Sequence, residues 1–313
     1  MRSRIKGVIV LIFSLVTLCS SKCFAEDSLF QEARKLQREG RFDEAISAYR
    51  NYLTGATGEE NLTDEQYSTY TDALVQLMNT FQSKGEPVEC ISVLQEVFMS
   101  SPLLQDEFLR DFHSVMGYAL SRTEDMSKAE EVTLKALTLP LHRATPERYF
   151  RDYAYAAAVF YSNPEYQDEV IEWCHEALIQ AKACRNTSGQ QWVMSMLGNL
   201  YKRNGDLNGA LELYQQSLDD SRSRGDELGV LNSLSSLTDL FLYWDIPEYA
   251  DMYASEAVDV ERGMKQKNPM VSAQTYINKG RALFQLGKED SVSFYIGQAR
   301  ELCEALPYNS GMV

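Results

Sequence analysis

The feature that most constrains the fold is an internal repeat. Residues 197–214 contain Gly198, an aromatic Tyr201 three residues later, a turn glycine Gly205, and then Ala210 and Tyr214. The same order of small, large and turn-forming residues returns, with repeats that start near residues 26, 71, 110, 151, 191, 231 and 273. Repeats of about this length each form one unit that buries its apolar face against its neighbours. The chain is therefore expected to fold as an array of stacked units.

The small residue of each repeat predicts a close crossing between two helices. We number the repeat so that Gly198 stands at position 8 and Ala210 at position 20. Helix axes approach to about 8 Å only where the crossing side chains are small, so position 8 is expected to face position 20. The seven residues at position 8 are Ala33, Met78, Gly117, Ala158, Gly198, Thr238 and Gly280.

Position 15 is where each repeat is expected to turn from its first helix to its second. Glycine adopts the positive φ of a tight turn between helices without steric cost. Glutamate in the third and fourth repeats, and aspartate in the sixth, predict degenerate turns. The seven residues at position 15 are Gly40, Gly85, Glu124, Glu165, Gly205, Asp245 and Gly287.

This order of residues resembles the tetratricopeptide repeat (TPR), a pair of antiparallel helices with small residues where they cross. The resemblance covers residues 26–306, although the spacing of 39 to 45 residues exceeds the length usual in the family, and Met78 and Thr238 depart from its pattern. It implies an all-α solenoid of about seven TPR-like helical hairpins that form a right-handed superhelix. The composition agrees, because only 8 prolines and 17 glycines interrupt 313 residues.

The first 25 residues are expected to be a signal peptide and not part of the fold. Arg2, Arg4 and Lys6 precede an apolar run over residues 8–18, and Cys23 and Ala25 place small residues before a cleavage point. The apolar run is shorter than the roughly 20 residues that a membrane-spanning helix needs. The sequence therefore predicts export to the periplasm or another extracytoplasmic space, and no later segment is apolar enough to span a bilayer.

The charge of the chain argues against nucleic acid as a direct partner. The formal net charge is −15, and it becomes −19 without residues 1–25, which carry four basic and no acidic side chains. Such an acidic surface repels phosphate backbones. We expect no direct binding of nucleic acid by this chain.

Residues that carry chemistry are sparse and scattered. His113, His142 and His175 lie about 30 residues apart in different repeats, and no spacing typical of zinc ligands is present. Adjacent acids such as Glu130 and Glu131 face different directions on a helix, and the sequence contains no nucleophile-elbow or phosphate-loop motif. We expect no catalytic residue, no metal and no cofactor. The alternative is a hydrolase on an α/α framework, which would need acids that converge across a cleft.

The cysteines are too few to form a disulfide scaffold in an exported chain. Cys174 and Cys184 lie ten residues apart on one predicted helix, which is too far for a disulfide bond between them. We expect four small, buried core residues. These are Cys90, Cys174, Cys184 and Cys303.

The TPR resemblance implies that the first helices of successive hairpins line a concave groove, into which positions 2, 5, 9, 12 and 13 point. Amides, aromatic rings and a few cations at these positions suit a protein or peptide partner. The candidate partner-binding residues are Asn79, Tyr118, Tyr155, Trp192, Asn199, Lys202, Arg203, Asn232, Asp239, Tyr243 and Arg281.

Four of these candidates lie on adjacent repeats and can receive a carboxylate: Asn199, Lys202, Arg203 and Asn232. The alternative is that they only solvate the inner surface. Ser195 stands where TPRs that clamp a carboxylate carry a lysine, which argues against that ligand class.

The last repeat is followed by a short tail, residues 307–313, which is too short for a polar capping helix. Such a helix normally covers the final apolar face of a helical array. The seventh hairpin is therefore expected to make a contact there or to continue into a longer polypeptide. The expected function is an exported scaffold that binds a protein or peptide in its groove. The alternative is the periplasmic sensor half of a transmembrane signalling or transcription regulator, because the chain resembles the exported TPR arrays of Bacteroidetes-type regulators.

Overall fold

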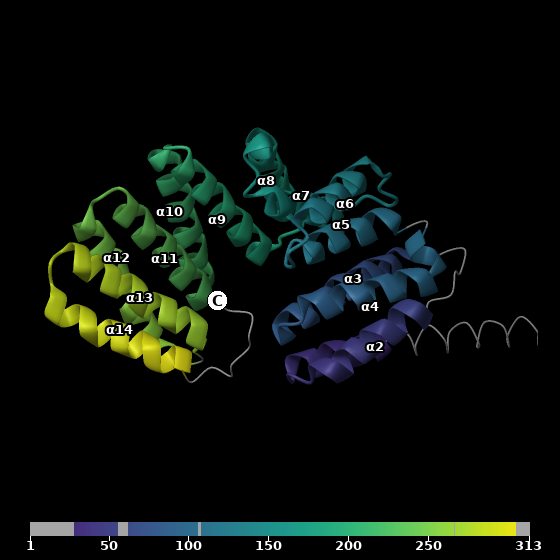
Figure 1. Cartoon of the computed structure of the whole chain (residues 1–313), viewed down its shortest axis with the longest axis horizontal. Helices are drawn as coiled ribbons and strands as arrows, with labels where there is room; N and C mark the ends of the chain where they lie inside the picture. Colours follow the sequence, from purple (N-terminus) through teal and green to yellow (C-terminus); the bar gives the residue numbers. More distant parts are fainter. Residues whose placement is uncertain (1–27, 56–61, 106–107, 266, 305–313) are drawn as a thin grey trace, which may run out of the picture. The chain divides into compact units, whose positions relative to one another are not determined.

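The computed structural model describes residues 28–55, 62–105, 108–265 and 267–304, and these residues form helices without a strand (Figure 1). The expected signal peptide, residues 1–25, and the tail, residues 307–313, lie outside the described residues. The chain divides into two compact units, with the boundary between Ala144 and Thr145. Each unit is a stack of helical hairpins.

The first unit contains hairpins one to three. Hairpin one pairs a helix described over residues 28–38 with α2 (Phe42–Gly55). Hairpin two pairs α3 (Asp64–Lys84) with α4 (Pro87–Ser100), and a short 3-10 helix, η1 (Pro102–Gln105), follows it. Hairpin three pairs α5 (Leu109–Leu120) with α6 (Met126–Thr138).

The second unit contains hairpins four to seven. Hairpin four pairs α7 (Pro146–Phe160) with α8 (Gln167–Ala183), which are joined through the 3-10 helix η2 (Pro164–Tyr166). The next three hairpins are α9 (Thr187–Arg203) with α10 (Leu207–Arg224), α11 (Glu227–Tyr243) with α12 (Pro247–Gly263), and α13 (Pro269–Gln285) with α14 (Glu289–Glu304). The predicted all-α fold of TPR-like hairpins is confirmed.

The turns follow the residue at position 15. The four glycines there have φ between 69 and 82°, and Asp245 has φ 61°, so the sixth hairpin makes the same kind of turn with a residue that tolerates it less well. Glu124 and Glu165 lie instead in longer connections, of which the second contains η2. The sequence therefore identifies which hairpins turn tightly, and it overestimates the irregularity of the sixth.

In the three hairpins with a glycine at position 8, the nearest side chain comes from one helical turn beyond position 20. A Cβ atom added to Gly198 would lie within 3.0 Å of three atoms of the Tyr214 ring, and one added to Gly280 would lie 2.8 Å from Cδ1 of Ile296. In hairpin three the atom that a Cβ on Gly117 would strike is Oγ1 of Thr133. These partners stand at position 24. A Cβ on Gly117 would also lie 3.3 Å from the backbone oxygen of Ala129, at position 20. Position 8 therefore lies near both turns of the second helix in that hairpin, and the side chain that fills the crossing comes from position 24.

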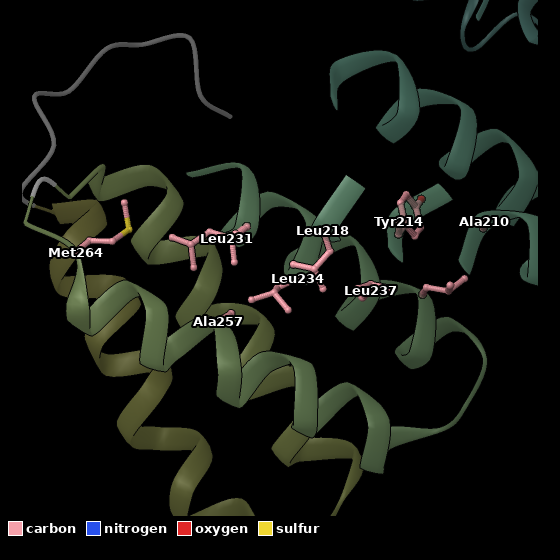
Figure 2. Packing of buried hydrophobic residues seen from close by; sticks show 10 residues of the cluster. Ala210, Tyr214, Leu218, Leu231, Leu234, Leu237, Ala257 and Met264 are labelled. Carbon is pink, nitrogen blue, oxygen red and sulfur yellow. The ribbon is translucent and has the colours of Figure 1, made fainter. Parts of the chain in front are cut away.

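Stacking of hairpins five and six forms a continuous apolar core (Figure 2). Along α11, Leu231, Leu234, Leu237 and Leu240 recur every three residues, and none is more than 2% exposed. They pack against α10 through Tyr214 and Leu218. Burial of one leucine stabilises the folded chain by about 1.5–3 kcal/mol, so this stripe is a main contribution to the junction between the two hairpins.

The cysteines are only partly as expected. Cys90 and Cys174 are buried, and burial raises the pKa of each thiol to about 12. Cys184 is half-buried at the end of α8, and Cys303 is exposed near the end of α14. The prediction of a core position is wrong for Cys303 because no described helix covers the outer face of hairpin seven, on which it lies. All four are free thiols.

Candidate functional site

A cavity of about 570 Å³ opens between the first helices of hairpins five and six. Six of its thirteen lining residues are serines, whose side chains are small and carry a hydroxyl group. Only one lining residue, Asp226, has a carboxylate. The lining residues are Ser188, Gln191, Trp192, Ser195, Tyr214, Ser217, Asp226, Leu228, Gly229, Asn232, Ser233, Ser235 and Ser236.

Two capped helix starts position the walls of this cavity. The side chain of Asn186 accepts a hydrogen bond from the backbone N–H of Gly189 at 2.9 Å, and Asp226 accepts one from Gly229 at 3.0 Å. Such caps satisfy N–H groups that the first turn of a helix leaves without partners. Residues three or four apart then share one face, so Trp192 and Ser195 of α9 lie opposite Asn232 and Ser236 of α11 across the cavity.

Internal hydrogen bonds fix part of the lining and leave part available. Nε2 of Gln191 donates to Oγ of Ser221 at 2.6 Å and to Oδ2 of Asp226 at 3.0 Å. The hydroxyls of Ser217 and Ser233 bond to each other at 2.9 Å, and both residues are buried.

In contrast, the hydroxyl of Ser195 and the side-chain amide of Asn232 have no hydrogen-bond partner within the described part of the chain. A serine hydroxyl and an asparagine amide both donate and accept. The cavity therefore offers neutral groups that can serve either role toward a ligand.

Trp192 gives the cavity its aromatic wall. Its ring makes an edge-to-face contact with Tyr155 of α7, with centroids 6.3 Å apart and planes at 66°. Tyr155 is itself buried, at 7% exposure. The structure therefore brings together two predicted candidates, with Tyr155 supporting Trp192 from the preceding hairpin.

Farther along the same helices, a carboxylate joins three successive hairpins. Asp239 of α11 accepts from Nζ of Lys202 on α9, and from Nη1 of Arg281 on α13 at 3.0 Å. Burial alone would raise the pKa of Asp239, but the hydrogen bond and charge of Lys202, followed by those of Arg281, hold that pKa below its ordinary value. The cations are therefore partly neutralised by a group of this chain.

The remaining candidates of the second unit point in different directions. Asn199 accepts a hydrogen bond from the hydroxyl of Tyr214 at 2.7 Å, and Arg203 donates to the backbone carbonyl of Tyr161 at 3.0 Å. Tyr243 is 60% exposed, and Nζ of Lys202 lies 5.8 Å from its ring centroid. Because Lys202 turns toward α11 and Arg203 toward the end of α7, the four residues expected to receive a carboxylate do not converge on one point.

Two candidates, Asn79 of α3 and Tyr118 of α5, lie in the first unit. Both are half-buried, and burial raises the pKa of Tyr118. Their role in binding stays a prediction, as does that of the candidates in the second unit.

Sequence reasoning missed most of the serines that line the cavity. Ser195 and Ser235 both stand at position 5 of their repeats, and Ser236 follows directly. The recurrence of a serine at one groove position in two consecutive repeats was the signal available. It is weak, because a serine at a half-exposed helix position is common without any ligand.

Comparison with known proteins agrees with the fold. The model of the tetratricopeptide repeat family matches residues 192–223, which cover most of hairpin five. No curated protein matches the chain. The chain carries a tetratricopeptide repeat within a fold of TPR-like hairpins.

Several solved structures are similar to the chain. The apo form of RapI aligns with a TM-score of 0.64 and 10% identity, over 92% of this chain and 79% of its own length. NprR in complex with its cognate peptide NprX aligns with a TM-score of 0.54 and 11% identity, over 89% of this chain and 79% of its own length. BtubC (BKLC) from P. vanneervenii aligns with a TM-score of 0.54 and 17% identity, over 75% of this chain and 94% of its own length. At these identities the likeness shows the fold alone.

Among the described residues, no helix has both the length and the apolar character required to cross a membrane. No group of three or more His, Cys, Asp or Glu side chains within the same residues is arranged to hold a metal ion.

Proposed function

We propose that this TPR-type solenoid binds an extended peptide or protein segment along the first helices of hairpins five to seven. The observation that carries the proposal is the cavity between α9 and α11, with its neutral hydroxyl and amide groups beside Trp192. Neutral donors and acceptors suit the backbone of an extended segment, and an aromatic ring supplies apolar contact area. NprR, a solved structure similar in fold, holds a peptide.

The charges beyond the cavity define a second property of the ligand. Lys202 and Arg281 contribute two positive charges and Asp239 one negative charge, so this part of the face has a local excess of one positive charge in a chain with a formal charge of −15. Asp239 follows Ser236 by three residues on α11, about 4.5 Å along the axis. A ligand with an uncharged segment and one neighbouring acidic side chain fits this arrangement.

A binding role fits the site better than a catalytic one. Asp226, the carboxylate that lines the cavity, already accepts hydrogen bonds from Gly229 and Gln191. A general acid or base must reach the proton that it transfers, and a carboxylate held in a helix cap is poorly placed for this. We therefore assign the protein to the binding modules and not to the enzymes.

We also propose that the protein works outside the cytoplasm. The basic and apolar residues of positions 1–25 support export. A fusion of alkaline phosphatase to the C-terminus tests this, because the phosphatase is active only after export. Activity that survives deletion of residues 1–25 would contradict the proposal.

Selection from a random peptide display library tests the binding site. The full chain is the target, and the Ser195→Trp variant fills the cavity. Ser223→Trp is the matched control, because Ser223 is exposed on α10 and its hydroxyl bonds only to the carbonyl of Asp220. We expect selected peptides to bind Ser195→Trp at least tenfold more weakly and Ser223→Trp with unchanged affinity.

Two charge variants test the acidic side chain of the ligand. Arg281→Glu is expected to lower the affinity for peptides that carry an acidic side chain. Arg203→Glu should lower it less, because Arg203 faces Tyr161. Equal binding to the wild-type chain and to Ser195→Trp would contradict the proposed site.

A further inference from the structure

The outer face of hairpin seven exposes residues at positions that hairpin six buries. In hairpin six, positions 12, 20 and 24 are Leu242, Ala250 and Ala254, which are 6%, 0% and 0% exposed. They lie in one apolar cluster with Ala282 of α13, so the first helix of the next hairpin covers them. The corresponding residues of hairpin seven are Phe284, Val292 and Ile296. Phe284 is 66% and Ile296 41% exposed, and Val292 is half-buried.

These residues surround a hollow of the size expected for inserted side chains. A cavity of about 300 Å³ is lined by Gly280, Phe284, Gln285, Val292 and Ile296, together with Arg281 and Leu242. The row of positions 12, 20 and 24 in hairpin seven corresponds to the apolar row that hairpin six buries under α13. An exposed apolar surface of this kind marks an interaction site.

One charge distinguishes this face from the junctions within the second unit. Position 28 is Leu218 in hairpin five and Val258 in hairpin six, and both are buried against the next first helix. In hairpin seven, position 28 is Arg300, which is exposed and makes no ion pair within the described residues. At the junction of hairpins six and seven, Val258 packs against Ala273 and Tyr276, which lie in the first two turns of α13.

The covering helices of this chain define the kind of helix that fits. On α11 the stripe is Leu231, Leu234, Leu237 and Leu240, with an apolar residue every three positions. On α13 the equivalent stripe includes Lys279, which pairs with Asp251 of hairpin six. Hairpin seven has Ser293 in the place of Asp251, so the apolar pattern of α11 is the one that fits. We propose that the face formed by Phe284, Val292, Ile296 and Arg300 docks an amphipathic helix of a partner protein. That helix carries an apolar stripe at three-residue spacing and an acidic side chain in its first two turns, opposite Arg300.

A second copy of this chain, stacked end to end, fits the face poorly. The equivalent stripe on the first helix of hairpin one is Leu29, Glu32 and Lys35. Glu32 is exposed, and the Lys35 side chain is 71% exposed. Stacking would bury these two charges against Ile296 and Phe284, and a buried charge without a partner is costly.

A display library of 17-residue helical peptides, randomised on one face, is the probe for this proposal. The full chain is the target, and the Phe284→Ser/Ile296→Ser variant is the comparison. We expect selected peptides to carry the three-residue apolar stripe and to bind the double variant at least tenfold more weakly. Ile296 also contacts Gly280 at the crossing of hairpin seven, so the double variant is expected to melt somewhat below the wild-type chain, and circular dichroism checks that it is folded. Phe284→Ser alone changes a side chain that is 66% exposed, so it should melt as the wild-type chain does and still weaken binding.

Two further variants keep the result specific. Arg300→Glu is expected to shift the selected charged residue in the first two turns from acidic to basic. Ser195→Trp, which blocks the groove cavity, should leave these peptides bound with unchanged affinity, so failure here and failure of the proposed groove are separable.

The proposal is overturned if no peptide is enriched, or if enriched peptides bind the Phe284→Ser/Ile296→Ser variant as tightly as the wild-type chain. It is also overturned if sedimentation shows a dimer of the wild-type chain that the same double variant abolishes, because the occupant would then be a second copy.

Discussion

Hairpins five and seven use the same residue at their helix crossing, yet they place it in different surroundings. Gly198 meets the ring of Tyr214, which is 1% exposed and whose hydroxyl is held by Asn199 at 2.7 Å. Gly280 meets Cδ1 of Ile296, which is 41% exposed. A glycine in the repeat pattern therefore marks a close crossing, but the rigidity of that crossing depends on whether the next hairpin covers the partner side chain.

The largest effect is expected from Gly198→Ala. The new Cβ overlaps the Tyr214 ring, which has no room to move, so the substitution should lower the free energy of unfolding by about 2–3 kcal/mol. Urea denaturation measures the change. The double variant Gly198→Ala/Tyr214→Leu should lose less free energy of unfolding than the two single variants lose together, because the leucine removes the overlap. Strict additivity would show that the crossing is not where the strain arises.

Glu261→Gln tests the junction between hairpins six and seven. Glu261 is 2% exposed and accepts from Tyr276 at 2.7 Å, Ser272 at 2.9 Å and Lys267 at 3.0 Å. Removal of its charge should cost about 1–3 kcal/mol at neutral pH, because hydrogen bonds to a buried charged group are replaced by weaker ones.

The same variant predicts a pH dependence. Burial alone would raise the pKa of Glu261, but the hydrogen bonds from Tyr276, Lys267 and Ser272 hold it below the ordinary value of 4.5. The ionised group therefore stabilises the fold above pH 4.5, and this stabilisation is lost as pH falls through the lowered pKa. The stability difference between the wild-type chain and Glu261→Gln should be constant near neutral pH and shrink below pH 4.5. A difference that grows on acidification would contradict the network.

A smaller effect is expected at the turn of hairpin five. Gly205 has φ 82°, and a Cβ there would meet no atom within 4 Å. Gly205→Ala should therefore cost only the strain of a positive φ, about 1 kcal/mol. Asp245→Gly is the reverse experiment at φ 61°, and it should raise stability by a similar or smaller amount. Thermal melting of both variants measures the two changes in stability. Melting temperatures that shift in the same direction would show that strain from the positive φ does not explain them.

The smallest effect is expected from Gly280→Ala, the counterpart of the first substitution. The atom in contact is the far end of the Ile296 side chain, which can rotate toward solvent, so the loss should stay within about 0.5 kcal/mol. A loss as large as that of Gly198→Ala would mean that the outer face of hairpin seven is as tightly held as a covered junction.

The sequence allows the fold to be predicted because the two strongest signals are local. Gly205 and Gly287 fix turns by their own backbone preference, and a small residue at position 8 is required wherever two helices cross closely. The partner at position 24 is not readable in the same way, because it depends on the angle at which the helices cross. Tyr214 and Ile296 share this position but differ in their exposure, which is a property of the neighbouring hairpin.

The candidate site was less predictable than the fold. The repeat frame assigns Trp192 and Asn232 to the same position of adjacent repeats, and both line one cavity. It does not predict that Lys202 and Arg281 share Asp239, because long side chains select partners across hairpins by reach and not by register. The hydroxyl lining was missed for a related reason, since a serine has no sequence signal that separates a binding role from solvation.

Stacking along one direction has a consequence for how the second unit comes apart. Hairpin six packs on both sides, against α10 through Leu231 and Leu234 and against α13 through Ala250 and Ala254. Hairpin seven leaves Phe284 and Ile296 in solvent. Backbone amides of α14 should therefore exchange with deuterium through local fraying, while those of α11 wait for a larger opening. A ligand that slows exchange in α14 alone would thus be recognised as one bound at the end of the stack.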